Sequence, residues 1–298
     1  MSDLSPQGPS PRSPCREGTW SRARKKAHVA APSYLDSIGA RRDRNHGPPP
    51  RLDAWRATAF GTVAEDYDRY RPGPDAAALD WLLRPADRDV LDVGAGTGAL
   101  TRLLIARGSR VTAVEPDDRM RRVLTGGAPT ATILEGVAEA LPVGDRSQDA
   151  VLAHSSWHWV DPDRAVAEAA RVLRPGGRLG ALWTRLDGDV DWVGELWERL
   201  RPHRERRRSG AGLRELRLPA AARFGPVEGP RVIRFNRRFT RAQLLGLAGT
   251  YSGVAARPPS ERAALLAQIR VALDADPRLG APAGVEVPML THCWRATR

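Results

Sequence analysis

The sequence predicts an α/β fold, a doubly wound and mostly parallel sheet of about seven strands, and two observations lead to this class. First, a short apolar run, Val90 to Val93, is followed by glycines at alternate positions and then by leucines at helical spacing. Second, another apolar run, Arg110 to Glu115, begins soon after those leucines. Strand, glycine turn, helix and strand in this order indicate a parallel sheet whose helices lie on its faces.

The glycine turn predicts a binding site for an anionic ligand. Glycine lacks a Cβ atom, so it adopts backbone angles forbidden to other residues and lets a ligand approach the main chain closely. The unpaired N–H groups at the start of the next helix attract negative charge. Glu115 lies 21 positions after Gly94, where a carboxylate holds the ribose diol of a nucleotide.

Later segments continue the same pattern. Asp149 to Leu152 predicts a strand, and Asp161-Pro162 predicts the start of a helix, because a capping side chain precedes a proline at the first helical position. Pro175, Gly176 and Gly177 predict its end and lead into a strand over residues 178–184.

The last third of the chain predicts a helical cap and two terminal strands. We expect helices over residues 192–200 and from Ser260 onwards, and strands over residues 232–240 and 285–294. Pro288 in the last strand suggests an edge strand or a bulge, because proline cannot donate to a ladder.

The glycine spacing decides between two cofactors. Gly94, Gly96 and Gly98, preceded by Asp92, give GxGxG instead of the GxGxxG of dinucleotide sites. This pattern resembles the class I S-adenosylmethionine-dependent methyltransferases, and in particular the methyltransferase type 11 domain. Three further segments match that family in order, at residues 136–142, 149–152 and 171–177, so the resemblance covers residues 54–186 well.

The resemblance implies a Rossmann-like fold, S-adenosyl-L-methionine as cofactor and transfer of its methyl group (EC 2.1.1.-). Within the family, residues 154–161 and the segment from Tyr67 to Gly73 are most similar to the trans-aconitate methyltransferases. The cofactor-binding residues that it implies are Tyr67, Arg71, Asp92, Gly94, Ala95, Gly96, Gly98, Glu115, Pro116, Val137, Ala138, Glu139 and His154. Val137 stands where many relatives carry an aspartate for the adenine amino group, so adenine is expected to rest on apolar contacts and backbone.

The implied reaction is an in-line attack by a small-molecule acceptor (a carboxylate, hydroxyl or amine) on the sulfonium methyl group. Positioning supplies most of the catalysis, and a base is needed only where the attacked atom carries a proton of high pKa. His158 and His154 are the candidate catalytic residues, because histidine titrates near neutral pH. Packing of the turn after the fourth strand is an equally open interpretation of His158.

The segment from residue 60 to Tyr70 predicts a short helix with two tyrosines, followed by Arg71. In relatives this region closes over the cofactor, whereas a helix that simply packs on the sheet would show the same pattern. Both interpretations stay open at this point.

Composition restricts the remaining possibilities. The 298 residues contain only two cysteines, Cys15 and Cys293, which argues against a disulfide framework or a metal centre. No apolar run approaches the roughly 18 residues that span a bilayer, and no signal peptide is visible. We therefore expect a cytoplasmic protein without membrane contact. The pattern does not indicate an oligomeric state.

The net charge of +12 is unevenly distributed. Residues 54–180 carry 16 basic and 18 acidic side chains, whereas residues 181–298 carry 21 and 12. Nearly all the basic residues are arginines without interleaved aromatics, so nucleic acid is not an expected partner. Arginine runs over residues 201–208 and 231–241 could hold an acidic acceptor, or could form a solvated face.

Residues 1–53, rich in proline, serine and arginine, are expected to form a disordered basic tail. The expected methyltransferase domain is then 54–298, with a cofactor-binding core at 54–186 and a cap with the terminal strands at 187–298. Two other functions remain as alternatives: a nicotinamide-dependent Rossmann oxidoreductase, and a non-catalytic methyltransferase-like binding module.

Overall fold

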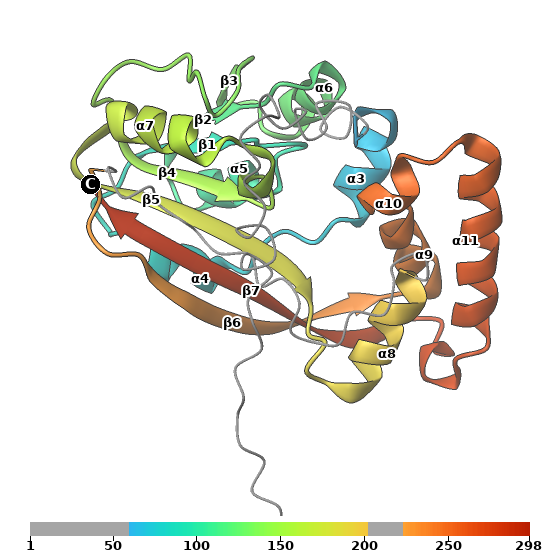
Figure 1. The fold of residues 1–298 in the computed structure, drawn as a ribbon. Coiled ribbons are helices and arrows are strands. Elements are labelled where there is room, and N and C mark those ends of the chain that lie inside the picture. Colours follow the sequence, from blue (N-terminus) through green and yellow to red (C-terminus); the bar gives the residue numbers. More distant parts are fainter. Residues whose placement is uncertain (1–59, 202–222) are drawn as a thin grey trace, which may run out of the picture. The chain divides into compact units, whose positions relative to one another are not determined.

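The computed structural model describes residues 60–201 and 223–298, so the tail expected at 1–53 lies outside the described residues. A seven-stranded sheet has the order β3-β2-β1-β4-β5-β7-β6 (Figure 1). The first five are parallel, and β7 runs antiparallel to both β5 and β6. The strands are β1 (Asp89–Val93), β2 (Arg110–Val114), β3 (Thr132–Leu134), β4 (Gln148–His154), β5 (Leu173–Leu186), β6 (Glu228–Phe239) and β7 (Val285–Thr297). The predicted fold class is confirmed.

Helices cover both faces of the parallel part. On one face, α4 (Ala76–Leu82), α5 (Ala99–Ala106) and α6 (Asp118–Gly127) bury their apolar residues against β1, β2 and β4. The opposite face is covered by α7 (Pro162–Val172), whose alanines and valines pack on β4 and β5. The Asp161 side chain caps α7 as the sequence predicts, accepting from two backbone N–H groups of its first turn.

A second group of helices lies beyond one end of β5, β6 and β7 (Figure 1). It contains α8 (Asp191–Leu200), α9 (Arg241–Gly249), α10 (Ser252–Ala255) and α11 (Pro259–Asp274), which share one apolar core with the ends of those strands. The segment η1 (Phe60–Val63) and α3 (Ala64–Tyr70) lies between this cap and the parallel sheet, with η2 (Trp157–Trp159) and η3 (Pro277–Leu279) as short connections. None of the described helices combines the length and apolar character that crossing a bilayer requires.

Strand β5 begins earlier than the sequence predicts, at Leu173 instead of Arg178. Pro175, Gly176 and Gly177 do not end the helix as predicted, because α7 ends at Val172 and these residues lie inside β5, where Gly176 has φ +77°. Gly176 N–H donates to the Arg298 carbonyl, and Arg298 N–H donates to the Gly177 carbonyl. The end of β7 therefore holds this segment in the sheet through a contact that local sequence cannot reveal.

The expectation of an edge strand or a bulge around Pro288 is wrong, because β7 lies between β5 and β6 and its pairing shows no register shift at Pro288. The Pro288 carbonyl accepts from Asp187 N–H at 2.9 Å, just beyond the end of β5 at Leu186. A residue's N–H and C=O point to the same side of a strand, so the missing donor faces the side where β5 has already ended. Proline is tolerated there at a local edge inside the sheet.

Candidate cofactor and acceptor site

In the glycine turn after β1, the two outer glycines are closely packed and the middle one faces open space. Gly94, Gly96 and Gly98 have φ values of +65°, +58° and +92°, a region that disfavours other residues. A Cβ on Gly94 would lie 2.6 Å from Ser156 Cβ, and one on Gly98 would lie 2.4 Å from Leu124 Cδ1. No atom lies within 4 Å of a Cβ built on Gly96, so the middle of the turn faces the space a ligand would need.

Glu115, at the end of β2, is tied to this turn. One carboxylate oxygen accepts from Gly96 N–H at 2.8 Å and the other from Asp117 N–H at 3.0 Å. Burial raises the pKa of Glu115, while these two hydrogen bonds act in the opposite direction. Ala95 and Gly94 add backbone bonds to the Val114 carbonyl, and Arg121 donates to the carbonyl of Pro116. Hydrogen bonds therefore connect the loop after β1 with the loop after β2, where the ribose is expected.

Asp92 has a buried oxygen with no protein partner. Thr101 Oγ1 donates to Asp92 Oδ2 at 2.6 Å, whereas Oδ1 is buried without a hydrogen bond to any described residue. Burial, with Glu115 adding to it, raises the pKa of Asp92 to about 7. A buried hydrogen-bond acceptor without a donor costs free energy of folding, and a ligand that supplies the donor removes this cost. The Asp92 carboxylate thus fits a cationic or N–H donor of a ligand at the glycine turn.

The loop after β3 presents an apolar surface. Val137 is 44% exposed, and the neighbouring Ala138 is buried in the core under α7. Glu139 Oε1 accepts from Asp161 N–H at 2.7 Å, so this carboxylate joins two loops. Val137 is therefore available for an apolar ligand contact, while the cofactor role expected for Glu139 stays a prediction.

The segment η1–α3 lies directly on the loop after β2. A Cβ on Gly61 would come within 2.5 Å of Asp117 Oδ2, and Arg102 in α5 donates to Asp68 in α3 at 2.7 Å. On its other side, α3 meets the cap, where the Tyr70 ring lies against Gly246. The segment thus bridges the expected cofactor edge and the cap, which favours a covering role over simple packing on the sheet.

Arg71 follows α3 and is held by aromatic rings instead of carboxylates. Its guanidinium carbon lies 5.2 Å from the Tyr67 ring centroid and 4.6 Å from that of Tyr251. Arg71 Nη2 donates to the Thr250 carbonyl at 3.0 Å, and Arg71 Nε is buried without a hydrogen bond to a described residue. Arg71 and Tyr67, both expected at the cofactor, therefore lie in contact, and Tyr251 is a further partner that the sequence did not single out.

His154, the last residue of β4, lies near this cation. Its Nε2 is 3.1 Å from Thr184 Oγ1, which is 2.9 Å from Thr291 Oγ1. Burial, followed by the charge of Arg71, lowers the pKa of His154 to about 4. The imidazole is therefore neutral at neutral pH, in a chain of hydroxyl groups that no local pattern predicts.

His158 lies elsewhere. Trp183 Nε1 donates to His158 Nδ1 at 3.4 Å, and the imidazole lies 4.5 Å from the Trp159 ring. Trp183 and Thr184 are consecutive in β5 and point to opposite faces of the sheet, so the two histidines do not converge. The packing interpretation of His158 is favoured, because its acceptor nitrogen already has a partner.

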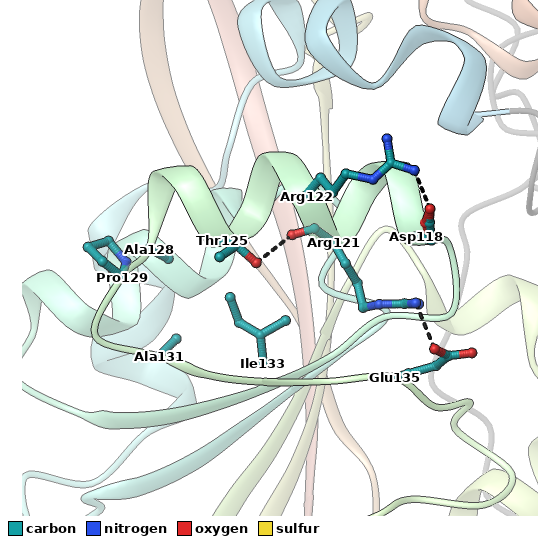
Figure 2. Close-up of a pocket in the computed structure, with 9 residues that line it drawn as sticks. All are labelled: Asp118, Arg121, Arg122, Thr125, Ala128, Pro129, Ala131, Ile133 and Glu135. Atoms are coloured by element: carbon teal, nitrogen blue, oxygen red, sulfur yellow. Dashed lines mark hydrogen bonds and ion pairs between the residues drawn. The ribbon is translucent and has the colours of Figure 1, made fainter.

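A separate cavity of about 610 Å³ lies between α6 and β3 (Figure 2). Arg121 and Glu135 line it and form an ion pair across it at 2.7 Å. Arg121 also donates to the Glu115 carbonyl, so the cavity lies beside the loop that is expected to hold the ribose. Its lining contains none of the residues expected to bind the cofactor, and Arg121 is a support that the sequence analysis missed.

The arrangement of glycine turn, acidic residue after β2 and seven-stranded sheet defines a class I S-adenosylmethionine-dependent methyltransferase. A family model, "Methyltransferase domain", matches residues 91–181. An uncharacterized methyltransferase of Mycobacterium bovis is 41% identical over 239 residues, covering 80% of this chain and 95% of the relative. The chain therefore belongs to the methyltransferase family.

Two further comparisons agree with that assignment. A solved structure from Anaeromyxobacter dehalogenans, provisionally described as a type II methyltransferase, is 32% identical with a TM-score of 0.59 and covers 77% of this chain and 98% of that one. A malonyl-[acyl-carrier protein] O-methyltransferase of Methylococcus capsulatus is 36% identical over 136 residues, covering 42% of this chain and 50% of the relative.

Proposed function

We propose that the protein transfers the methyl group of S-adenosylmethionine to a small-molecule acceptor in the cytoplasm. One observation carries the cofactor assignment: the unmatched Asp92 Oδ1, buried beside a glycine turn whose middle residue faces open space. The cofactor's amino-acid part offers an ammonium group, which matches a carboxylate acceptor of this kind.

The proposed roles follow the strand ends. Asp92 and the open face of the glycine turn at Gly96 hold the methionine end, and Glu115 with Pro116 holds the ribose. Val137 and Ala138 contact the adenine through apolar surface and backbone, with Glu139 fixing their loop. Residues 54–186 form the cofactor half, and residues 187–298 form the cap and terminal strands.

Arg71 is the proposed partner of the cofactor's carboxylate, with Tyr67 holding its guanidinium in place. Its position supports this, since α3 is tied by Asp68 to Arg102 in the helix that follows the glycine turn. The cofactor supplies a methyl group already activated by its sulfonium. The chain then has to hold an acceptor at the right distance and angle, and α3 and the cap shield that space from water.

His154 is the proposed residue for contact with the acceptor. A neutral imidazole between Arg71 and two threonine hydroxyls can accept a proton from a hydroxyl acceptor, and for a carboxylate acceptor it needs only to orient the group. The resemblance of residues 154–161 to the trans-aconitate enzymes supports a small acid as acceptor. The O-methyltransferase that acts on malonyl-[acyl-carrier protein], by its name, is compatible with that class.

Calorimetric titration of the full chain with S-adenosylhomocysteine and with NAD tests the cofactor assignment. We expect binding of the homocysteine nucleoside alone, weakened at least about tenfold by Glu115→Ala. Glu135→Ala, which removes an exposed carboxylate next to the same loop, is the matched control and should leave binding unchanged. Binding of NAD instead would support the oxidoreductase, and binding of neither would refute the proposal.

A second titration tests Arg71. The nucleoside 5′-methylthioadenosine lacks the amino-acid part of the cofactor. Arg71→Met should therefore weaken S-adenosylhomocysteine about tenfold or more and leave 5′-methylthioadenosine unchanged. Equal loss for both nucleosides would remove Arg71 from the methionine end.

A substitution at His158 separates catalysis from packing. The sequence alone predicts that His158→Ala impairs turnover more than cofactor binding. The contacts with Trp183 and Trp159 predict instead a lowered melting temperature with cofactor affinity and turnover falling together. Thermal unfolding beside S-adenosylhomocysteine titration and turnover measurement distinguishes the two outcomes.

A further inference from the structure

The residues that follow β4 are packed directly on the glycine turn. Ser156 Oγ donates to the Val93 carbonyl at 2.7 Å, and a Cβ on Gly94 would lie 2.6 Å from Ser156 Cβ. The residue before it, Ser155, has φ +57°, a conformation that is unfavourable for residues other than glycine and is often retained at functional sites. The backbone therefore holds His154, the last residue of β4, at the edge of the proposed cofactor site.

Two threonines hold one nitrogen of the His154 ring. Thr184 in β5 and Thr291 in β7 lie directly opposite each other in the antiparallel ladder, with their hydroxyl oxygens 2.9 Å apart. Thr184 Oγ1 lies 3.1 Å from His154 Nε2. The other nitrogen, Nδ1, makes no hydrogen bond to any residue of 60–201 or 223–298. One nitrogen of this half-buried ring is thus engaged by hydroxyls, and the other is available to a ligand.

The buried end of this chain of hydroxyls decides the direction of its hydrogen bonds. Thr291 is fully buried, so water cannot accept its hydroxyl proton, and Thr184 Oγ1 is the one acceptor that the described part of the chain offers it. An unmatched buried O–H group costs free energy of folding, so Thr291 donates to Thr184. Thr184 then directs its own proton to His154 Nε2, the remaining acceptor within its reach among the described residues.

The charge of the imidazole completes the assignment. Burial, followed by the positive charge of Arg71, lowers the pKa of His154 to about 4, and no carboxylate of the described residues contributes to this shift. At neutral pH the ring therefore carries a single proton. Because Nε2 accepts from Thr184, that proton lies on Nδ1. A general base needs a free lone pair, and in this form the lone pair of the ring is already engaged.

We propose that Thr291 and Thr184 are positioning residues that hold His154 as the Nδ1–H tautomer, so that His154 offers the methyl acceptor a hydrogen-bond donor instead of a base. This inference rests on the proposed methyltransferase function and chooses between the two roles open to His154, accepting a proton and orienting the methyl acceptor. The Nδ1–H group orients a lone pair of the methyl acceptor, and no proton passes to the imidazole. Two hydroxyls on other strands thus set the chemistry at the end of β4.

Nitrogen NMR measures the tautomer directly, because a protonated ring nitrogen and one with a free lone pair differ widely in chemical shift. The full chain, labelled with nitrogen-15 in its histidine rings, is recorded at neutral pH, alone and saturated with S-adenosylhomocysteine. His154→Gln identifies the signals of His154 among those of the six histidines. We expect the Nδ1–H form to exceed the Nε2–H form at least about fivefold in both samples.

The same preparation separates this inference from the function on which it rests. Calorimetric titration with S-adenosylhomocysteine is carried out beside the NMR measurement. Absence of nucleoside binding would refute the proposed function, whereas the tautomer of His154 is measured whether or not the nucleoside binds.

Variants connect the tautomer to the two hydroxyls. The double variant Thr184→Val/Thr291→Val removes both hydroxyls and leaves neither unmatched, so the Nε2–H form, which free histidine prefers, should then predominate. Thr184→Ser and Thr291→Ser keep the hydroxyls and should keep the wild-type ratio. Thr112→Val makes the same change in β2 and is the matched control. Melting temperatures show whether each variant is folded.

Three results would overturn the inference. The first is a wild-type protein in which the Nε2–H form is equally or more populated, with or without the nucleoside, because Nδ1 would then be free to act as a base. The second is a doubly protonated His154 ring at neutral pH. The third is a double valine variant with the wild-type ratio, which would show that the hydroxyls of Thr184 and Thr291 do not fix the tautomer.

Discussion

The two halves of the described chain are built on different principles. In residues 60–186 all strands are parallel, and each of the first four ends at, or within three positions of, a residue of the proposed site. In residues 187–201 and 223–298 the strands are antiparallel, and the helices form a separate apolar core. The cofactor half presents backbone groups in fixed positions, whereas the cap presents side chains that distant contacts hold in place.

This difference teaches where each kind of specificity resides. The Glu115 carboxylate accepts a hydrogen bond from Gly96 N–H, so the two parts of the proposed nucleoside site hold each other in place. Arg71, Arg201 and Tyr251 meet only because α3, α8 and α10 converge. Changes in the cofactor half should therefore act on cofactor binding, and changes in the cap should act on the acceptor and on stability.

The strongest test of the cofactor half compares two glycines. Gly96 and Gly108 both have positive φ, +58° and +88°, and neither has an atom within 4 Å of a built Cβ. Alanine at either position should cost roughly 1–2 kcal/mol of stability, because a side chain disfavours this conformation. Gly96→Ala should also abolish S-adenosylhomocysteine binding, at least about 100-fold, since its methyl group enters the open space of the turn.

Calorimetry and urea unfolding measure both effects. Gly108→Ala is the control, with the same conformational strain and an expected nucleoside affinity equal to that of the wild type. Equal affinities for the two variants would show that the ligand does not approach Gly96, and the division between the halves would fail.

In the cofactor half, Asp92→Asn should have opposite effects on the stability of the protein and on its affinity for S-adenosylhomocysteine. The carboxyl has a pKa of about 7 in the folded protein and 3.8 when unperturbed. Since the folded state binds the proton more tightly, wild-type stability falls as pH rises from about 4 to 7 and stays low above that. The neutral amide should therefore raise the free energy of unfolding by about 2–4 kcal/mol at pH 8, with a smaller gain at pH 5.

The same variant should weaken S-adenosylhomocysteine about tenfold or more, because the amide cannot match an ammonium group. Urea unfolding at both pH values and calorimetry check the pair of effects. Asp80→Asn, at an exposed carboxylate, should change neither. If Asp92→Asn were less stable than the wild type at pH 8, the Asp92 carboxylate would have to be stabilised by a donor or cation of the protein itself.

A third comparison sets a glycine of the cap against one of the cofactor half. A Cβ on Gly246, in α9, would lie 2.5 Å from the Tyr70 ring, whereas Gly126, in α6, has no neighbour within 4 Å. Gly246→Ala should lower the free energy of unfolding by about 1–3 kcal/mol through overpacking. Gly126→Ala should raise it by up to about 1 kcal/mol through helix propensity. Thermal unfolding tests the pair, and two stabilising substitutions would show that α3 and the cap are loosely packed.

The sequence predicts the cofactor half well because its signals are local. Asp92, the three glycines and the Asp161 cap lie within a few residues of the structure they specify. Glu115 is recognisable at a distance of 21 positions because one strand, turn and helix separate it from Gly94. The early start of β5 escaped prediction, because Arg298 at the far end of the chain holds it.

The surroundings of Tyr251 could not be predicted, because they also depend on distant parts of the chain. Tyr251 precedes a four-residue helix, and its ring contacts arginines at the ends of two other helices. Local sequence placed His154 and His158 together, but His154 contacts Thr184 and His158 contacts Trp183, consecutive residues of β5 whose side chains point to opposite faces of the sheet. Long-range contacts decide which polar residues share a pocket.

The smallest expected effect concerns Val137, the residue proposed to contact the adenine. Val137 is exposed on the loop after β3, so an aspartate there needs no rearrangement of the core. Val137→Asp should tighten S-adenosylhomocysteine about three- to tenfold, because one hydrogen bond to the adenine amino group is worth about 1 kcal/mol. Val271→Asp, at a 70% exposed valine of α11, controls for the added charge. An unchanged or weakened dissociation constant in the Val137 variant would show that adenine does not lie against this loop, since a carboxylate at its edge would otherwise find a donor.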